Sequence, residues 1–231
     1  MTFLLLGVSA LPGCSYSHGK TRVSDKMDQT PKTGQASKAN VLDGIKLTSM
    51  FDGEKLGFWK KTDFYQAGNA YVKDGCLILE KSEWMTGVTW TGPVISTNYE
   101  ISFEAMRVEG NDFFCGLTFP VGKSSCSLIL GGWSNQVCGL SSIDHKDASL
   151  NETTLRIALE NNRWYRVTLR VTPDAIQASL DSEWIIDVDT TGKTIDVRPE
   201  CIPNLPLGFA TYKTTGAIRN IHLTRYRVPS P

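Results

Sequence analysis

A polar loop at residues 142–152 carries the densest group of side chains with chemical potential. Asp144 and Asp147 offer hard carboxylate oxygens of the kind that Ca²⁺ prefers. His145, in the same loop, has an imidazole suited to general base catalysis near neutral pH. The loop therefore predicts a Ca²⁺ site at Asp144 and Asp147, with His145 as a candidate base. Loops are polar in any case, and this spacing matches no EF-hand, so an ordinary surface loop is the alternative.

Two tryptophans occupy positions where an indole ring can meet a sugar. Trp133 follows the pair Gly131-Gly132 at the expected end of a strand, and Trp164 alternates outward beside Arg166. The apolar C–H face of a sugar stacks on an indole while polar neighbours bond its hydroxyls. Trp133 and Trp164 are therefore candidate carbohydrate-binding residues. Packing of either ring beneath a loop is the structural alternative.

The carboxylates of one expected strand do not match a glycosidase pair. Glu100 and Glu104 share a face but lie four residues apart, which is about 13 Å along a strand. Catalytic carboxylate pairs in glycosidases are separated by roughly 5–9.5 Å. The motifs GxSxG, GxGxxG and HExxH and the P-loop are all absent from the sequence. A solvated outer face explains Glu100 and Glu104 equally well.

The composition describes an aromatic-rich globular chain. It has 231 residues, 41% of them hydrophobic, with 24 Lys and Arg balanced by 24 Asp and Glu. This balance excludes the basic footprint of a nucleic-acid-binding protein. No apolar run approaches the roughly 20 residues that span a bilayer.

Alternating apolar and polar residues predict antiparallel strands throughout the region after residue 42. Residues 98–108 place Tyr99, Ile101 and Phe103 on one face, and residues 163–172 alternate in the same way. Further strands are expected at Cys76–Glu80, Phe113–Phe119, Cys126–Gly132, Val137–Ser142, Ala175–Leu180, Trp184–Asp189, Leu207–Tyr212 and Ile218–Tyr226. About ten short strands with little helical periodicity predict an all-β sandwich of two antiparallel sheets.

The cysteines after Cys14 are expected to be free thiols in the core. They are five in number, which is odd, and no CxxC spacing occurs. A hairpin around Val121-Gly122 would place Phe119 opposite Cys126 and Cys115 near Leu130. In that register Cys115 and Cys126 are too far apart to form a disulfide.

The N-terminal residues resemble an export signal. Residues 3–11 read FLLLGVSAL, and the following Leu11-Pro12-Gly13-Cys14 resembles the lipobox of bacterial lipoproteins. We therefore expect a signal peptide at 1–14 with lipidation at Cys14, a polar tether at 15–41, and the β-domain at 42–231. The predicted location is the periplasm or cell envelope, with membrane contact through the lipid anchor only.

Several segments, in order, resemble the bacterial 3-keto-disaccharide hydrolase domain family. The similar segments are Met50–Trp59, Ala70–Leu77, Tyr99–Arg107, Asn111–Phe119, Asn161–Val167, Pro206–Phe209 and Ile218–Ile221. The resemblance implies a concanavalin A-like lectin/glucanase jelly roll and a carbohydrate partner. It also implies cleavage of 3-keto-glycosides. A ketone at C3 acidifies the neighbouring C2 proton, so elimination across C1–C2 becomes possible.

The resemblance also assigns site residues. Glu104 and Asp112 join His145 as candidate catalytic groups, and Arg107 and Asn111 join the two tryptophans as candidate substrate-binding residues. The family's Tyr-Glu pair on the strand after Asn111 is replaced here by Cys126-Ser127-Leu128. Three functions therefore remain open: an envelope-anchored enzyme that cleaves glycosides, a glycan-binding module without chemistry, and a structural surface domain.

Overall fold

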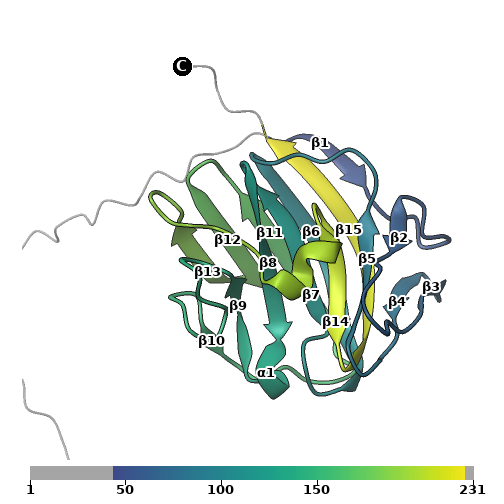
Figure 1. Ribbon diagram of the computed structural model, residues 1–231. Helices are drawn as coiled ribbons and strands as arrows, with labels where there is room; N and C mark the ends of the chain where they lie inside the picture. Colours follow the sequence, from purple (N-terminus) through teal and green to yellow (C-terminus); the bar gives the residue numbers. More distant parts are fainter. Residues whose placement is uncertain (1–43, 227–231) are drawn as a thin grey trace, which may run out of the picture. The chain divides into compact units, whose positions relative to one another are not determined.

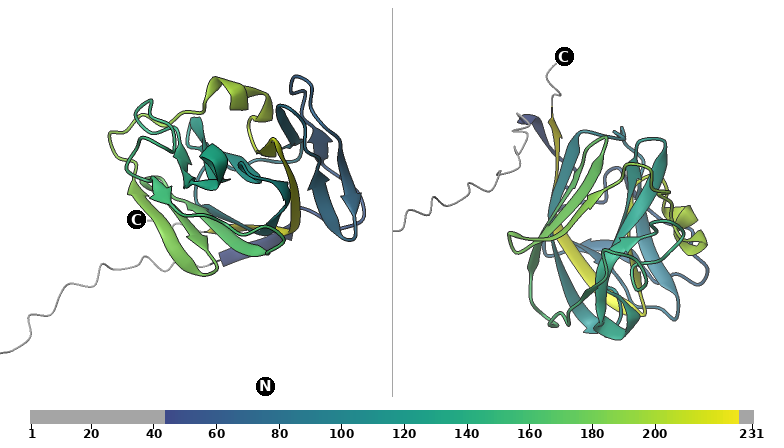
Figure 2. Two further views of the ribbon diagram at one scale, coloured as in Figure 1. Left: turned by 90° about the horizontal axis from the view of Figure 1, so that it is seen from below. Right: turned by 90° about the vertical axis from the view of Figure 1, so that its left-hand side faces the viewer.

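The structure, a computed structural model, describes residues 44–226, and these form two antiparallel β-sheets packed face to face (Figures 1 and 2). The eight-stranded sheet has the order β13-β12-β11-β6-β15-β4-β3, with β1 also paired to β15. Its strands are β1 (Gly44–Ser49), β3 (Ala70–Lys73), β4 (Cys76–Leu79), β6 (Tyr99–Gly110), β11 (Tyr165–Val171), β12 (Ala175–Leu180), β13 (Glu183–Asp189) and β15 (Thr214–Tyr226).

The seven-stranded sheet has the order β10-β9-β8-β7-β14-β5-β2. Its strands are β2 (Trp59–Lys61), β5 (Met85–Trp90), β7 (Cys115–Val121), β8 (Ser124–Gly131), β9 (Val137–Ser141), β10 (Leu155–Arg156) and β14 (Gly208–Tyr212). A short turn, α1 (Gly132–Asn135), follows β8, and a 3-10 helix, η1 (Pro199–Asn204), precedes β14. The predicted all-β jelly-roll sandwich is confirmed.

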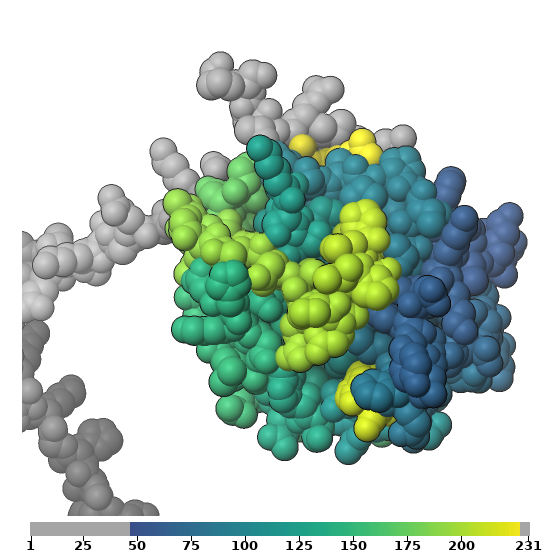
Figure 3. All heavy atoms as spheres, in the orientation of Figure 1, coloured from purple at the N-terminus to yellow at the C-terminus, as the bar shows by residue number. Residues whose placement is uncertain are grey.

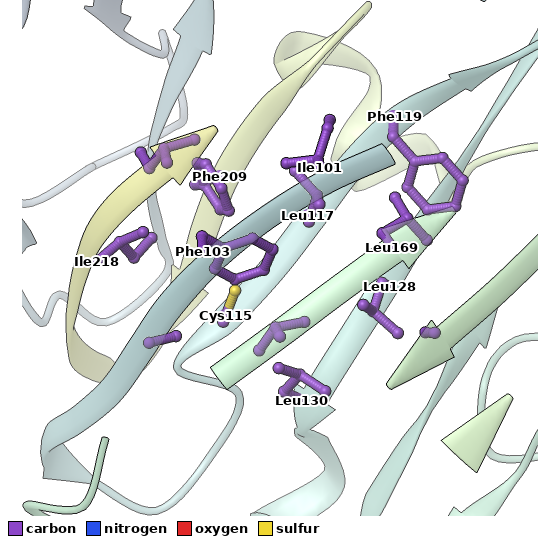
Figure 4. Close-up of a cluster of buried hydrophobic side chains, with 14 of the residues drawn as sticks. Ile101, Phe103, Cys115, Leu117, Phe119, Leu128, Leu130, Leu169, Phe209 and Ile218 are labelled. Carbon is purple, nitrogen blue, oxygen red and sulfur yellow. The ribbon is translucent and has the colours of Figure 1, made fainter. Parts of the chain in front are cut away.

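The core lies between the two sheets and is built by the alternation read in the sequence. From the eight-stranded sheet, Ile101 and Phe103 of β6 point toward Leu117 of β7 and Phe209 of β14 (Figure 4). The Phe103 and Phe209 rings meet edge to face, with centroids 5.0 Å apart. Such pairs add stabilisation beyond the apolar area that they bury.

The predicted hairpin register and the free thiols are both confirmed. β7 and β8 pair Phe119 with Cys126 and Cys115 with Leu130. All five cysteines of the described residues are free and buried. They therefore serve as small apolar side chains of the core.

Each sheet has an outer face, the side that points away from the core, and the two outer faces differ. That of the eight-stranded sheet is open and carries ion pairs between Glu100 and Arg170 and between Glu104 and Arg219. In the seven-stranded sheet, by contrast, β7, β8 and β9 are buried on both faces over almost their whole length. Loops and η1 must therefore cover its outer face.

The segment η1 lies over the outer face of the seven-stranded sheet and contacts β5 and β14 (Figure 3). Glycines at Gly87 and Gly208 allow this close approach. A Cβ on Gly208 would lie 2.6 Å from the side chain of Asn204 in η1. The fully buried Asn204 accepts a hydrogen bond of 2.7 Å from Thr62 Oγ1, which ties η1 to the end of β2.

All the strands predicted above are present, and the structure adds β1, β2, β3, β5 and β10. No helix within residues 44–226 has the length and apolar character needed to cross a membrane. Cys14 and the predicted signal and tether segments lie outside the described residues.

Candidate functional site

A cavity of about 530 Å³ opens on the outer face of the seven-stranded sheet, beside η1. We call it the aromatic cavity, because rings from several elements form its walls. Its lining residues are Asp63, Phe64, Tyr65, Trp84, Met85, Asp112, Phe113, Ile129, Trp133, Ser141, Arg198, Pro199, Glu200, Cys201, Pro203 and Tyr212. Its size lies within the range of small-molecule binding sites. Of the predicted site residues, only Asp112 and Trp133 line it.

An unusual turn holds Trp133 at the cavity wall. Trp133, Ser134 and Asn135 have φ angles of 50°, 58° and 63°, so three successive residues adopt the left-handed conformation. This conformation is costly for residues other than glycine and persists only where the surroundings enforce it. Gly131 and Gly132 enter the turn, and a Cβ on Gly131 would lie against the Arg107 guanidinium. The turn thus fixes the indole at the cavity.

Asp112 is attached to the same turn. Its Oδ2 accepts a hydrogen bond of 3.0 Å from the Ser134 amide, and its Oδ1 accepts one of 2.8 Å from the Phe113 amide. A carboxylate can accept about four hydrogen bonds, so the Asp112 carboxylate can still accept a hydrogen bond from a ligand. Asp112 and Trp133, which are far apart in the sequence, therefore form one unit at the cavity wall.

Arg107 lies behind this unit and does not reach the surface. It is 1% exposed, and its guanidinium donates to Asp112 O at 3.2 Å, Leu159 O at 2.9 Å, Asn161 Oδ1 at 3.0 Å and Asn135 Oδ1 at 2.7 Å. These bonds hold the two chain segments that carry Asp112 and Trp133. Arg107 thus supports these two segments from within the core and, unlike Asp112 and Trp133, does not line the aromatic cavity; direct contact with a sugar remains a prediction.

Arg198 and Glu200, which line the aromatic cavity near the start of η1, belong to an ion cluster. Arg198 donates to Asp147 Oδ2 at 3.0 Å and to Glu200 Oε1 at 2.9 Å. The hydrogen bonds from Arg198 hold the pKa of Glu200 below its usual range. Asp147 was a predicted metal ligand, but in the structure its carboxylate supports Arg198 and accepts a 2.6 Å bond from the Ser149 hydroxyl.

Several aromatic residues of the cavity were not singled out as site residues by sequence reasoning. The Tyr65 and Trp84 rings meet edge to face at 6.0 Å, and both side chains are exposed, at 72% and 50%. Phe113 and Tyr212 stack with centroids 6.0 Å apart. Tyr65 and Trp84 lie in loops, which give no periodic signal, and Phe113 and Tyr212 lie beside or at the end of strands. Only the folded chain shows that the four rings border one cavity.

Glu104 and Trp164 belong to a different surface. Both lie on the outer face of the eight-stranded sheet, where Glu104 Oε2 is 2.6 Å from Arg219 Nε. The Arg219 guanidinium in turn lies 4.0 Å from the centroid of the Trp164 ring. The structure therefore places the predicted residues Glu104 and Trp164 on the sheet that does not carry the aromatic cavity.

The remaining predicted residues are exposed and outside the cavity. The His145 side chain is 76% exposed and lies 3.0 Å from Asp196. Asp144 accepts a hydrogen bond of 2.8 Å from the Thr194 amide, and Asn111 is exposed after β6. Within residues 44–226, no three His, Cys, Asp or Glu side chains gather where they could hold a metal ion. The predicted Ca²⁺ site thus has no ligand cluster among these residues.

Solved structures of other proteins share the fold at low sequence identity. The Crh5 transglycosylase in complex with NAG has a TM-score of 0.54 and 9% identity, covering 80% of this chain and 85% of its own. The carbohydrate binding module CBM66 from Bacillus subtilis has a TM-score of 0.50 and 10% identity, covering 72% and 95%. A Bacillus subtilis protein of unknown function with a galectin-like fold has a TM-score of 0.52 and 12% identity, covering 74% and 92%.

The sequence itself identifies the family. No curated protein sequence matches the chain. The family model described as the 3-keto-alpha-glucoside-1,2-lyase-like domain matches residues 46–224, which is nearly all of the described region. The chain belongs to the 3-keto-alpha-glucoside-1,2-lyase-like domain family, as the resemblance of its strand motifs implied.

Proposed function

We propose that the aromatic cavity binds a carbohydrate and that the protein cleaves 3-keto-glycosides there. The observation that carries the proposal is the joint placement at the cavity wall of Trp133 and of Asp112, whose carboxylate is hydrogen-bonded to the turn that carries Trp133. Aromatic rings suit the apolar face of a sugar, and a fixed carboxylate suits proton abstraction. The family name and the fold shared with the Crh5 transglycosylase support a carbohydrate substrate.

The proposed reaction is an elimination. The Asp112 carboxylate takes the C2 proton of a 3-keto-glycoside, which the neighbouring ketone acidifies. The C2–H electron pair forms the C1=C2 double bond, and the C1–O bond breaks, so the aglycone leaves with the glycosidic oxygen and gains a proton. Arg198 also lines the cavity, and its guanidinium has five N–H groups, of which three bond Asp147 and Glu200; in this proposal a remaining N–H donates to the ketone oxygen as negative charge develops there.

The test compares two carboxylates on the two sheets. Wild-type protein, Asp112→Asn and Glu104→Gln are incubated with methyl 3-keto-α-glucoside, and substrate loss is followed by mass spectrometry. We expect Asp112→Asn to lose at least about 100-fold in rate, since general bases contribute that much or more, and Glu104→Gln to keep its activity. Equal loss in both variants, or undiminished activity of Asp112→Asn, would exclude Asp112 as the base.

The second candidate function is glycan binding without chemistry. It is favoured by the two backbone amides that already bond the Asp112 carboxylate, because these bonds alone would explain an aspartate at this position. The fold shared with CBM66 fits this function as well. Saturable binding of glucosides with no substrate loss in the same assay would establish it.

We also propose that the protein is exported and lipidated at Cys14. The apolar residues 3–11 and the following Leu11-Pro12-Gly13-Cys14 support this proposal. Labelling with a fatty-acid analogue in a bacterial host is expected to mark the wild-type chain in the membrane fraction and not the Cys14→Ala variant. Equal labelling of both, or a cytosolic wild-type chain, would contradict it.

A further inference from the structure

A row of hydroxyl groups crosses the outer face of the seven-stranded sheet beneath η1. The ladder of β7, β8 and β9 places Thr118 opposite Ser127 and Ser127 opposite Ser141. Thr118 Oγ1 and Ser127 Oγ lie 2.9 Å apart and share a hydrogen bond. All three residues are at most 2% exposed. Hydroxyls this deeply buried are normally hydrogen-bonded, as these first two are.

Ser141 differs from its neighbours in the row. Ser141 is one of the residues that line the aromatic cavity, yet it is 1% exposed and its Oγ has no hydrogen-bond partner among residues 44–226. An unpaired buried hydroxyl destabilises the folded protein. Alanine, which is smaller by one oxygen atom, would avoid that cost. A hydrogen-bond partner that enters through the cavity would explain the presence of the hydroxyl.

We propose that Ser141 is the specificity-determining residue of the cavity, whose hydroxyl bonds one polar substituent of the bound sugar. This inference rests on the proposed function and deepens it. A site that pairs a buried group with a substrate hydroxyl rejects analogues that lack it, because the protein group is then left unpaired. Ser141 thus selects sugars that carry a hydroxyl or carbonyl oxygen at the ring position nearest β9.

The test combines a protein variant with deoxygenated ligands. Binding of methyl α-glucoside and its 2-, 3-, 4- and 6-deoxy analogues is measured by calorimetry on wild-type protein and on Ser141→Ala. We expect one deoxy analogue to bind wild-type protein about 5- to 10-fold more weakly than the parent, the worth of one neutral hydrogen bond. Ser141→Ala should weaken parent binding by the same factor and bind that analogue and the parent equally.

Thermal stability separates this role from a structural one. Removing the unpaired hydroxyl in Ser141→Ala should leave the Tm unchanged or raise it. The matched variant Ser127→Ala breaks the bond to Thr118 and should lower the Tm by about 2–4 °C. Unaltered ligand preference in Ser141→Ala, or a Tm loss equal to that of Ser127→Ala, would overturn the inference. Failure of wild-type protein to bind any glucoside would instead overturn the proposed function, and the inference with it.

Discussion

Burial gives Arg107 a different role from that of the surface arginines. Its guanidinium bonds carbonyl and amide oxygens from several loops, whereas Arg166 of β11 is exposed. Lysine keeps the positive charge but has one compact ammonium in place of the planar fork, so it cannot reach the same acceptors. Such a substitution leaves buried oxygens unpaired.

We therefore expect Arg107→Lys to lower the free energy of unfolding by about 2–4 kcal/mol. Urea-induced unfolding measures this change. The control, Arg166→Lys, should stay within about 0.5 kcal/mol of wild type. An Arg107→Lys variant as stable as the control would show that the loop network does not depend on the guanidinium.

The buried thiols make stability depend on pH in the alkaline range. Burial raises the pKa of Cys138 from 9.0 to about 11 and that of Cys126 to about 12. Because the folded protein holds these protons more tightly than the unfolded chain, the stabilisation is complete below pH 9 and is lost as the pH rises above 9.

Each such thiol should therefore lower the free energy of unfolding by about 1.4 kcal/mol per pH unit above 9, until the folded pKa is reached. Urea unfolding of wild-type protein and Cys126→Ala at pH 8, 9, 10 and 11 tests this. The variant should show the shallower decline. Parallel curves for the two proteins would mean that Cys126 ionises equally in both states.

At the scale of elements, η1 depends on the small residues beneath it. A Cβ on Gly208 would lie 2.6 Å from both the Asn204 side chain and the Val88 carbonyl oxygen. Nothing lies within 4 Å of a Cβ on Gly122 in the β7–β8 turn, where only the φ of 58° opposes alanine. Substitution of Gly208 by alanine therefore tests close packing, whereas substitution of Gly122 tests backbone strain.

We expect Gly208→Ala to displace η1, to lower the free energy of unfolding by about 2–3 kcal/mol, and to weaken glucoside binding. Gly122→Ala should cost about 1 kcal/mol and leave binding unchanged. Chemical denaturation and calorimetry report the two effects. Wild-type binding by Gly208→Ala would show that η1 does not shape the cavity.

The elements that the sequence predicts well are those whose two faces differ. The strands β6 and β11 alternate strictly between buried and solvated residues, and their bounds agree with expectation within a few residues. The strand β5 was missed, because Met85–Trp90 contains Gly87 and is buried at three successive positions, which removes the alternation. Short edge strands such as β2, with three residues, leave too little pattern to read.

The same alternation also predicts that the side chain of Arg107 is buried. Arg107 is in phase with Tyr99, Ile101, Phe103 and Ala105, all of which point into the core. Its position on β6 thus predicts a buried guanidinium that must find internal acceptors. Asp112 and Trp133 follow the ends of strands, where alternation no longer predicts which face a side chain occupies. Their proximity therefore depends on the left-handed turn at 133–135.

At the scale of the whole molecule, the two outer faces of the sandwich decide which candidates can act together. Glu104 and Trp164 occupy the open face of the eight-stranded sheet, and Asp112 and Trp133 line the cavity on the other sheet. Both faces carry tryptophan, arginine and carboxylates, so composition cannot choose between them. The choice follows from tertiary structure, since the loops and η1 cover only one sheet.

The central claim is that the aromatic cavity, and not the open sheet, is the carbohydrate site. A crystal structure of the Asp112→Asn variant soaked with methyl 3-keto-α-glucoside tests it most directly, since the reaction is blocked while the cavity is kept. We predict density for the sugar between Trp133 and the rings of Trp84 and Tyr212. Density over Trp164 or Trp184 on the eight-stranded sheet, with the cavity empty, would contradict the claim.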